Sequence, residues 1–133
     1  MKKTYKGSCH CGAVRFEADI DLTQGTVKCN CSMCGKGRNW LAAVKADAFR
    51  LLTGESGLAE YQFGRKAIHH RFCQRCGLRP FSHGEPAGGD TFYAVNVACL
   101  DDVDPAELIA APVFWVDGRH DDFKNPPQET RHL

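Results

Sequence analysis

The sequence predicts a mainly β domain, and three observations lead to this fold class. Short segments in which apolar and polar residues alternate recur along the 133 residues, and glycine and proline separate them. Helical patterns are scarce, and the clearest one is only a few residues long. Clustered cysteines lie next to the predicted strands, and a metal ion that links distant strands stabilises a small β domain.

The first half of the chain contains four predicted strands, at 13–18, 26–28, 41–44 and 49–52. In the first of them, Val14, Phe16 and Ala18 alternate with other residues and should share one buried face. The second strand leads directly into a cluster of cysteines. The last two strands are expected to flank a turn.

The second half contains a predicted hairpin, a further strand and a short helix, at 60–72, 91–97 and 105–109. The hairpin turns at Gly64-Arg65-Lys66. The strand that follows it is the clearest in the chain because β-branched and aromatic residues dominate it. The helix should have Asp104 as its N-cap and Pro105 at its first position.

Size and composition fit one globular domain, with 43% hydrophobic and 25% charged residues. We expect this domain to cover residues 1–124 and to be followed by a polar C-terminal tail, 125–133. The net charge of +1 gives no reason to expect nucleic acid as a partner. The N-terminus lacks the apolar core of a secretory signal, and no apolar run approaches the roughly 20 residues that span a bilayer. We therefore expect a cytoplasmic protein with no membrane partner.

Of the eight cysteines, only Cys99 stands alone. The others form three clusters that each end in Cys-Gly, at 9–12, 29–35 and 73–77. Cys-x-Cys and Cys-x2-Cys turns are typical of zinc sites, and a glycine after the last cysteine is expected to take a positive φ. Metal binding is favoured over disulfides, which are rare in the cytoplasm and would close a strained ring within Cys-x-Cys.

The simplest partition of these thiols joins the two pairs. A closed four-thiolate zinc site with a structural role would then consist of Cys9, Cys11, Cys73 and Cys76. The ligands left for a second site are Cys29, Cys31 and Cys34. Cys99 or a histidine could complete that site as a second structural zinc, or its fourth position could be open to water or substrate.

An open site of three thiolates favours thiol chemistry. Three thiolates on Zn²⁺ leave one net negative charge, so the ion is poor at producing hydroxide but well suited to holding another thiolate. Basic and aromatic residues flank the cluster and could bind the carboxylates of a thiol substrate, or form an ordinary solvated turn: Lys28, Lys36, Arg38 and Trp40. His83 is a further candidate, as an acid or base for this site.

Together the three cysteine motifs resemble the glutathione-dependent formaldehyde-activating enzyme (GFA) family. The residues that carry the resemblance are 7–16, 29–34 and 72–77, and it extends over nearly the whole chain. It implies a β-tent fold of folded-over antiparallel sheets around a structural zinc, held by the two cysteine pairs. It also implies a second, labile zinc on Cys29, Cys31 and Cys34 at the active centre.

The reaction that the resemblance implies is that of a carbon–sulfur lyase, the reversible addition of glutathione to formaldehyde to give S-hydroxymethylglutathione. Asn30 stands where the family often has histidine. A lyase acting on this or a related glutathione–aldehyde adduct is one possible function, and a carrier that binds glutathione or another small thiol without turnover is the alternative. A zinc-ribbon interaction domain is disfavoured, because a ribbon needs only four ligands and the charge is near neutral.

Overall fold

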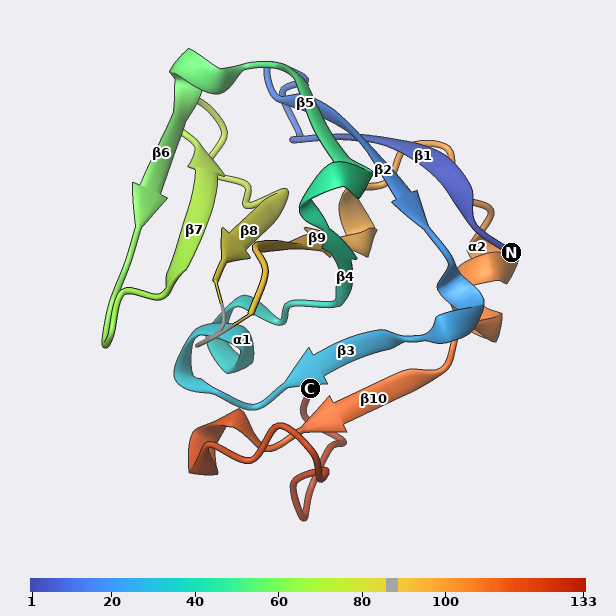
Figure 1. The fold of residues 1–133 in the computed structure, drawn as a ribbon, viewed down its shortest axis with the longest axis vertical. Coiled ribbons are helices and arrows are strands. Elements are labelled where there is room, and N and C mark those ends of the chain that lie inside the picture. The colour runs from blue at the N-terminus through green and yellow to red at the C-terminus, as the bar shows by residue number, and fades with distance from the viewer. Residues whose placement is uncertain (86–88) are drawn as a thin grey trace.

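Two β-sheets fold over a shared core in the computed structural model of the chain, which describes residues 1–85 and 89–133 (Figure 1). Within these residues, the smaller sheet has three antiparallel strands in the order β1-β2-β5. Their bounds are Lys3–Ser8, Arg15–Ile20 and Phe49–Thr53. The mainly β prediction, with folded-over sheets, is confirmed.

The larger sheet has seven strands within the same residues, in the order β10-β3-β4-β9-β8-β7-β6. The bounds are Thr26–Cys29 for β3, Leu41–Lys45 for β4, Leu58–Tyr61 for β6, Ile68–Cys73 for β7, Phe81–Gly84 for β8, Phe92–Asn96 for β9 and Val113–Val116 for β10. Neighbouring strands are antiparallel, except that β10 runs parallel to β3. The predicted hairpin is confirmed as β6–β7, in which Tyr61 pairs with His70.

The predicted strands at 41–44 and 49–52 form β4 and β5, but these strands do not pair with each other. The 3-10 turn Ala46–Ala48 carries the chain from the larger sheet to the smaller one. The turn Glu55–Gly57 then returns the chain to β6 in the larger sheet. These two crossings connect the sheets at the two ends of β5, as Figure 1 shows.

Aromatic side chains from both sheets fill the space between them. Phe49 of the smaller sheet stacks on Tyr93 of the larger one, with ring centroids 4.3 Å apart and an interplanar angle of 8°. The ring of Phe49 also lies 4.6 Å from that of Phe81 and 5.4 Å from that of Phe16. Phe16 is fully buried, as its alternation with polar residues predicted. This aromatic cluster fixes the two sheets relative to each other.

Two short α-helices lie in the described residues. The predicted helix is confirmed as α2, Pro105–Ala110, and its capping box joins Asp104 and Glu107. The other helix, α1, spans Ser32–Gly37 and was not predicted, because it begins inside the second cysteine cluster. No helix in the described part of the chain is long and apolar enough to cross a membrane.

Candidate metal centres and the adjoining groove

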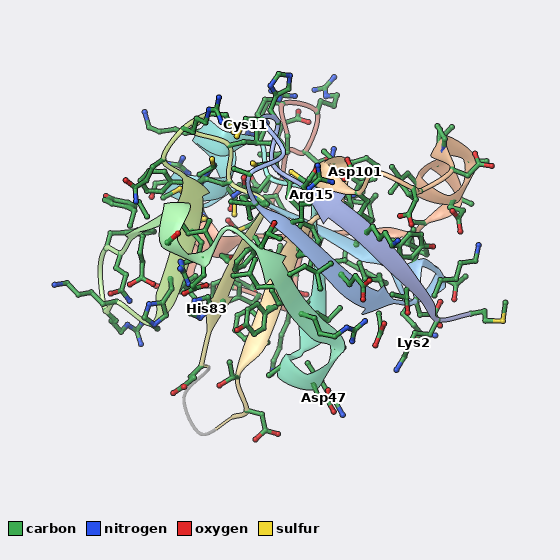
Figure 2. The ribbon with its side chains drawn as sticks, turned by 90° about the horizontal axis from the view of Figure 1, so that it is seen from above. Lys2, Cys11, Arg15, Asp47, His83 and Asp101 are labelled. Carbon is green, nitrogen blue, oxygen red and sulfur yellow. The ribbon has the colours of Figure 1, made fainter. Side chains whose placement is uncertain are left out.

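Two hairpin loops from different sheets bring the cysteine pairs of residues 9–12 and 73–77 together. One loop follows β1, and the other begins at the last residue of β7. Figure 2 shows Cys11 and Arg15 at one end of the β1–β2 hairpin and Lys2 at the other. The Sγ atoms of four cysteines lie within 4.8 Å of one another: Cys9, Cys11, Cys73 and Cys76. The structure therefore groups the two pairs into one four-thiol cluster.

The spacing of these thiols fits a tetrahedral zinc ion. The Sγ atom of Cys11 lies 3.6 Å from that of Cys9 and 3.7 Å from that of Cys73. A tetrahedron with zinc–sulfur bonds of about 2.3 Å has sulfur–sulfur edges of about 3.8 Å. All eight cysteines lie in the described residues and are free thiols. The cluster could thus hold a zinc ion with a complete set of four protein ligands.

Backbone groups favour the thiolate form in this cluster. The N–H of Val14 donates a hydrogen bond to Sγ of Cys9 at 3.3 Å. Hydrogen bonds from the backbone of Cys11 and then of Leu78 lower the pKa of Cys76 to about 6. Since zinc binds the deprotonated thiol, these donors prepare the loop for the metal.

The glycines of the Cys-Gly motifs differ in their backbone conformation. Gly12 has a φ of 80° and Gly77 a φ of 77°, as predicted for turns around the first cluster. Gly35 departs from the prediction, because it lies inside α1, where its N–H donates to the carbonyl of Cys31 at 2.7 Å. The residue with left-handed backbone is instead Arg38, which ends α1 with a φ of 51°.

The second cluster lies where β3 ends and α1 begins. Cys29 is the last residue of β3, Cys31 is the N-cap of α1, and Cys34 is in the first turn. The backbone N–H of Cys31 donates to Sγ of Cys29 at 3.4 Å, and that of Cys34 to Sγ of Cys31 at 3.3 Å. The three Sγ atoms lie within 4.8 Å of one another, and no fourth histidine, cysteine or acidic ligand in residues 1–85 and 89–133 joins them at that distance. This triplet could hold a zinc ion through three thiolates.

Hydrogen bonds among these thiols distribute negative charge unequally. Contacts with Cys29 and then with Cys34 lower the pKa of Cys31. Contacts with Cys29 and then with Cys31 raise the pKa of Cys34. The pKa of Cys29 is also raised, and its hydrogen bond with Cys31 is the largest cause. These hydrogen bonds therefore favour the thiolate at Cys31 over the thiolate at Cys29 or Cys34.

The segment that follows β10 packs against Cys29. The side-chain amide of Asn30 donates to Oδ1 of Asp117 at 2.8 Å, and the backbone N–H of Arg119 donates to Oδ1 of Asn30 at 3.0 Å. A β-carbon on Gly118 would lie 2.5 Å from Sγ of Cys29, so the backbone fits there only because this residue has no side chain. Asn30, the departure from the family pattern, thus anchors a distant segment beside the triplet.

An open groove of about 530 Å³ lies beside α1, and its lining includes Ser32 and Met33, which stand between Cys31 and Cys34 in the sequence. One side comes from α1, the other from the tip of the β6–β7 hairpin, and one arginine comes from the segment before β8. The lining includes Met33, Lys36, Gly37, Tyr61, Phe63 and Arg79. Of the residues predicted to contact substrate, Lys36 therefore lies in the groove.

The other three predicted substrate contacts lie outside the lining of the groove. The ammonium of Lys28 is 5.1 Å from the centre of the Trp40 ring. The indole N–H of Trp40 donates to the hydroxyl of Thr26 at 2.8 Å, which holds the ring against β3. The guanidinium of Arg38 donates to the carbonyl of His132 in the C-terminal segment at 3.2 Å.

Arg79 and Asn39 connect the groove to the triplet, and neither was predicted. Nη2 of Arg79 donates to Oδ1 of Asn39 at 3.1 Å, and Nδ2 of Asn39 donates to Sγ of Cys34 at 3.4 Å. Nη1 of Arg79 donates to the thioether of Met33 at 2.6 Å. No local motif marks either residue, and the contact between Arg79 and Asn39 joins segments 40 positions apart in the chain.

Two residues considered for the second site lie elsewhere. Cys99 is buried in the core, and burial is the largest cause that raises its pKa to about 11. The ring of His83 stacks on that of His69, with centroids 4.6 Å apart, and Nδ1 of His69 lies 2.8 Å from Glu60. His83 therefore groups with His69 and Glu60 rather than with the three cysteines. Nη1 of Arg71 is 3.4 Å from Nε2 of His83, and this positive charge disfavours a metal cation there.

Comparison with known proteins agrees with this arrangement of strands and thiols. The model of the glutathione-dependent formaldehyde-activating enzyme family matches residues 4–117. The crystal structure of a Rhodobacter sphaeroides protein, a structural genomics target, has the same fold with a TM-score of 0.69. Its sequence is 33% identical, and the match covers 82% of this chain and 99% of that chain. The chain therefore belongs to the glutathione-dependent formaldehyde-activating enzyme family.

Proposed function

We propose that this chain is a zinc-dependent carbon–sulfur lyase that adds a thiol, expected to be glutathione, reversibly to a small aldehyde such as formaldehyde. The observation that carries the proposal is that three thiols lie together at the start of α1, with no fourth cysteine, histidine or acidic ligand of the described residues within 4.8 Å, and that an open groove runs along this helix. In this proposal the four-thiol cluster is structural, and the catalytic site consists of Cys29, Cys31 and Cys34. Membership of the family supports a glutathione-related substrate.

The donor set of the triplet suits thiol chemistry. A zinc ion held by Cys29, Cys31 and Cys34 would be a weak Lewis acid, and it would supply a position in which an added thiol stays deprotonated. In the forward reaction, the substrate sulfur forms a bond to the aldehyde carbon, and the proton of the thiol ends on the aldehyde oxygen. In the reverse direction the carbon–sulfur bond breaks and the same atoms separate.

Residues of the chain hold the triplet in a fixed arrangement for this reaction. The amide of Asn39 donates to Sγ of Cys34, which limits the rotation of that thiol. The close approach of Gly118 does the same for Cys29. The groove beside α1 has room for the body of a tripeptide-sized thiol, because its volume lies within the range of small-molecule sites.

NMR exchange spectroscopy on a mixture of glutathione and formaldehyde tests the proposal. Protein loaded with zinc should increase the rate of interconversion between free glutathione and its hydroxymethyl adduct. Cys31→Ser, with the four-thiol cluster intact, should abolish the increase and is the matched control. An unchanged rate together with saturable binding of glutathione would contradict the lyase and favour the carrier.

A further inference from the structure

We propose that Arg79 is the carboxylate anchor of the groove, so that the preferred substrates are thiols that carry a carboxylate remote from the sulfur. This inference rests on the proposed function, since it assigns a substrate feature to the same site. It concerns a residue that touches the body of the substrate, away from the atoms that react.

The first observation is that Arg79 is a positive charge without an acidic partner. Among the described residues, no carboxylate lies within 4.0 Å of its guanidinium. A guanidinium has five N–H donors. The acceptors found for these donors are the amide oxygen of Asn39 and the thioether of Met33, and a thioether is a weak acceptor. A carboxylate is the group that would satisfy the remaining donors best.

The second observation is that the guanidinium is held in place. Nη2 is fixed by Asn39 at 3.1 Å, and Nη1 lies 2.6 Å from Sδ of Met33. A β-carbon on Gly37 would collide with Nη2 of Arg79, so the guanidinium lies directly on the backbone of α1. An arginine positioned before the ligand arrives loses less conformational entropy on binding.

The third observation is that few contacts separate Arg79 from the proposed metal ligands. Asn39 alone separates the guanidinium from Sγ of Cys34, through hydrogen bonds of 3.1 and 3.4 Å. A molecule whose sulfur reaches the triplet can therefore reach Arg79 with a group several bonds away. Lys36 lines the same groove and adds a second positive charge.

The wall opposite α1 is aromatic. Tyr61 and Phe63 are 51% and 42% exposed, and their rings stack with centroids 5.9 Å apart. These rings can cover the apolar atoms of an extended ligand, but they carry no positive charge to pair with a carboxylate. The charge complementarity of the groove therefore depends on Arg79 and Lys36.

A titration of three thiols into protein loaded with Co²⁺, whose visible absorption reports on thiolate ligands, tests the inference. The probes are glutathione, its dimethyl ester and 2-mercaptoethanol. Wild-type protein should bind glutathione about 10- to 100-fold more tightly than the dimethyl ester, as charge-assisted hydrogen bonds require. In Arg79→Met this ratio should fall toward one, because Lys36 is then the one positive charge left among the described residues that line the groove. Affinity for 2-mercaptoethanol should not change.

Three controls make the result specific. Lys45→Met removes an exposed positive charge outside the groove and should leave the ratio as in wild type. Arg79→Lys should keep part of the preference, because a single ammonium replaces the guanidinium fork. Gly37→Ala keeps the charge but displaces the guanidinium, and it should lower the ratio as Arg79→Met does.

The outcomes separate this inference from the proposed function. A ratio that stays the same in Arg79→Met overturns the carboxylate anchor and leaves the function intact. A cobalt spectrum that changes in Arg79→Met before thiol is added, or a loss of affinity for 2-mercaptoethanol, assigns Arg79 to support of Cys34 and also overturns the anchor. If no thiol alters the spectrum of the wild-type protein, the proposed function fails first.

Discussion

Gly118 lies against Cys29 so closely that a β-carbon on the glycine would be 2.5 Å from Sγ of the cysteine. These two residues are 89 positions apart in the chain, and they meet because β10 pairs in parallel with β3. The segment after β10 therefore forms part of the surroundings of the triplet. A side chain at position 118 must displace either that segment or the thiol.

Gly118→Ala should weaken metal binding at the triplet and leave the four-thiol cluster unaffected. The alanine methyl group pushes on Cys29, and a displaced ligand lowers metal affinity by about 10-fold or more. Competition with a chromophoric chelator measures the affinity of each zinc. The matched control is Gly57→Ala, because a β-carbon there would meet nothing within 4 Å. Equal affinities in the two variants would contradict the prediction.

Asn39→Ala should also weaken the second zinc, by removing a hydrogen bond rather than by collision. The amide of Asn39 donates to Sγ of Cys34 at 3.4 Å, and residues that orient a metal ligand are worth about 10- to 100-fold in affinity. The measurement is the same chelator competition. The control is the midpoint temperature of thermal unfolding of the metal-loaded protein, which should change little. A wild-type affinity would show that the hydrogen bond does not orient Cys34.

The two cysteine clusters should respond differently to loss of one ligand. Cys31→Ser should lose one zinc and remain folded, because α1 contributes little to the core. Cys73→Ser should lose the zinc proposed for the four-thiol cluster, and structural zinc contributes on the order of 10 kcal/mol to folding. Metal analysis of purified protein and circular dichroism check both variants. Loss of both metals in Cys31→Ser would show that the two sites are not independent.

His83 should make the free energy of unfolding depend on pH. Burial is the largest cause that lowers its pKa below the ordinary value of 6.5, and the charges of His69 and Arg71 act in the same direction. The unfolded chain then binds a proton more readily than the folded one. The contribution of neutral His83 to the free energy of unfolding is therefore fully present above pH 6.5. It is lost as the pH decreases below that value, through the lowered pKa of the folded protein.

His83→Gln should reduce this dependence, because glutamine does not titrate, and the part that remains includes His70, whose pKa burial also lowers. Urea unfolding at about pH 7.5 and about pH 5.5 gives the change in stability for each protein. The exposed His132 provides the matched control, and His132→Gln should keep the wild-type slope. Zinc content is measured at both pH values, so that loss of metal is not mistaken for titration. A slope equal to that of wild type in His83→Gln would assign the dependence to other groups.

Much of the fold could be predicted because its signals are local. Alternation identified β2 through Phe16, the Gly64-Arg65-Lys66 turn identified the β6–β7 hairpin, and Asp104 identified the start of α2. The strand β1 was not predicted, since only Tyr5 and Gly7 are buried among charged and polar neighbours. The pairing of β4 and β5 with different sheets was also missed. Short-range patterns identify strands, but they do not state which strands become neighbours.

The sequence by itself determined the chemistry of the thiols, because the ligands within each motif are only two or three residues apart. It therefore predicted two clusters, of which the second lacks one of the four ligands of a closed site. Tertiary structure decided what surrounds that second cluster. Asn39 and Arg79 meet across 40 positions and Asn30 and Asp117 across 87, so pairing of distant strands was needed to bring them together. Contacts of this kind depend on the packing of the whole chain, and no local pattern encodes them.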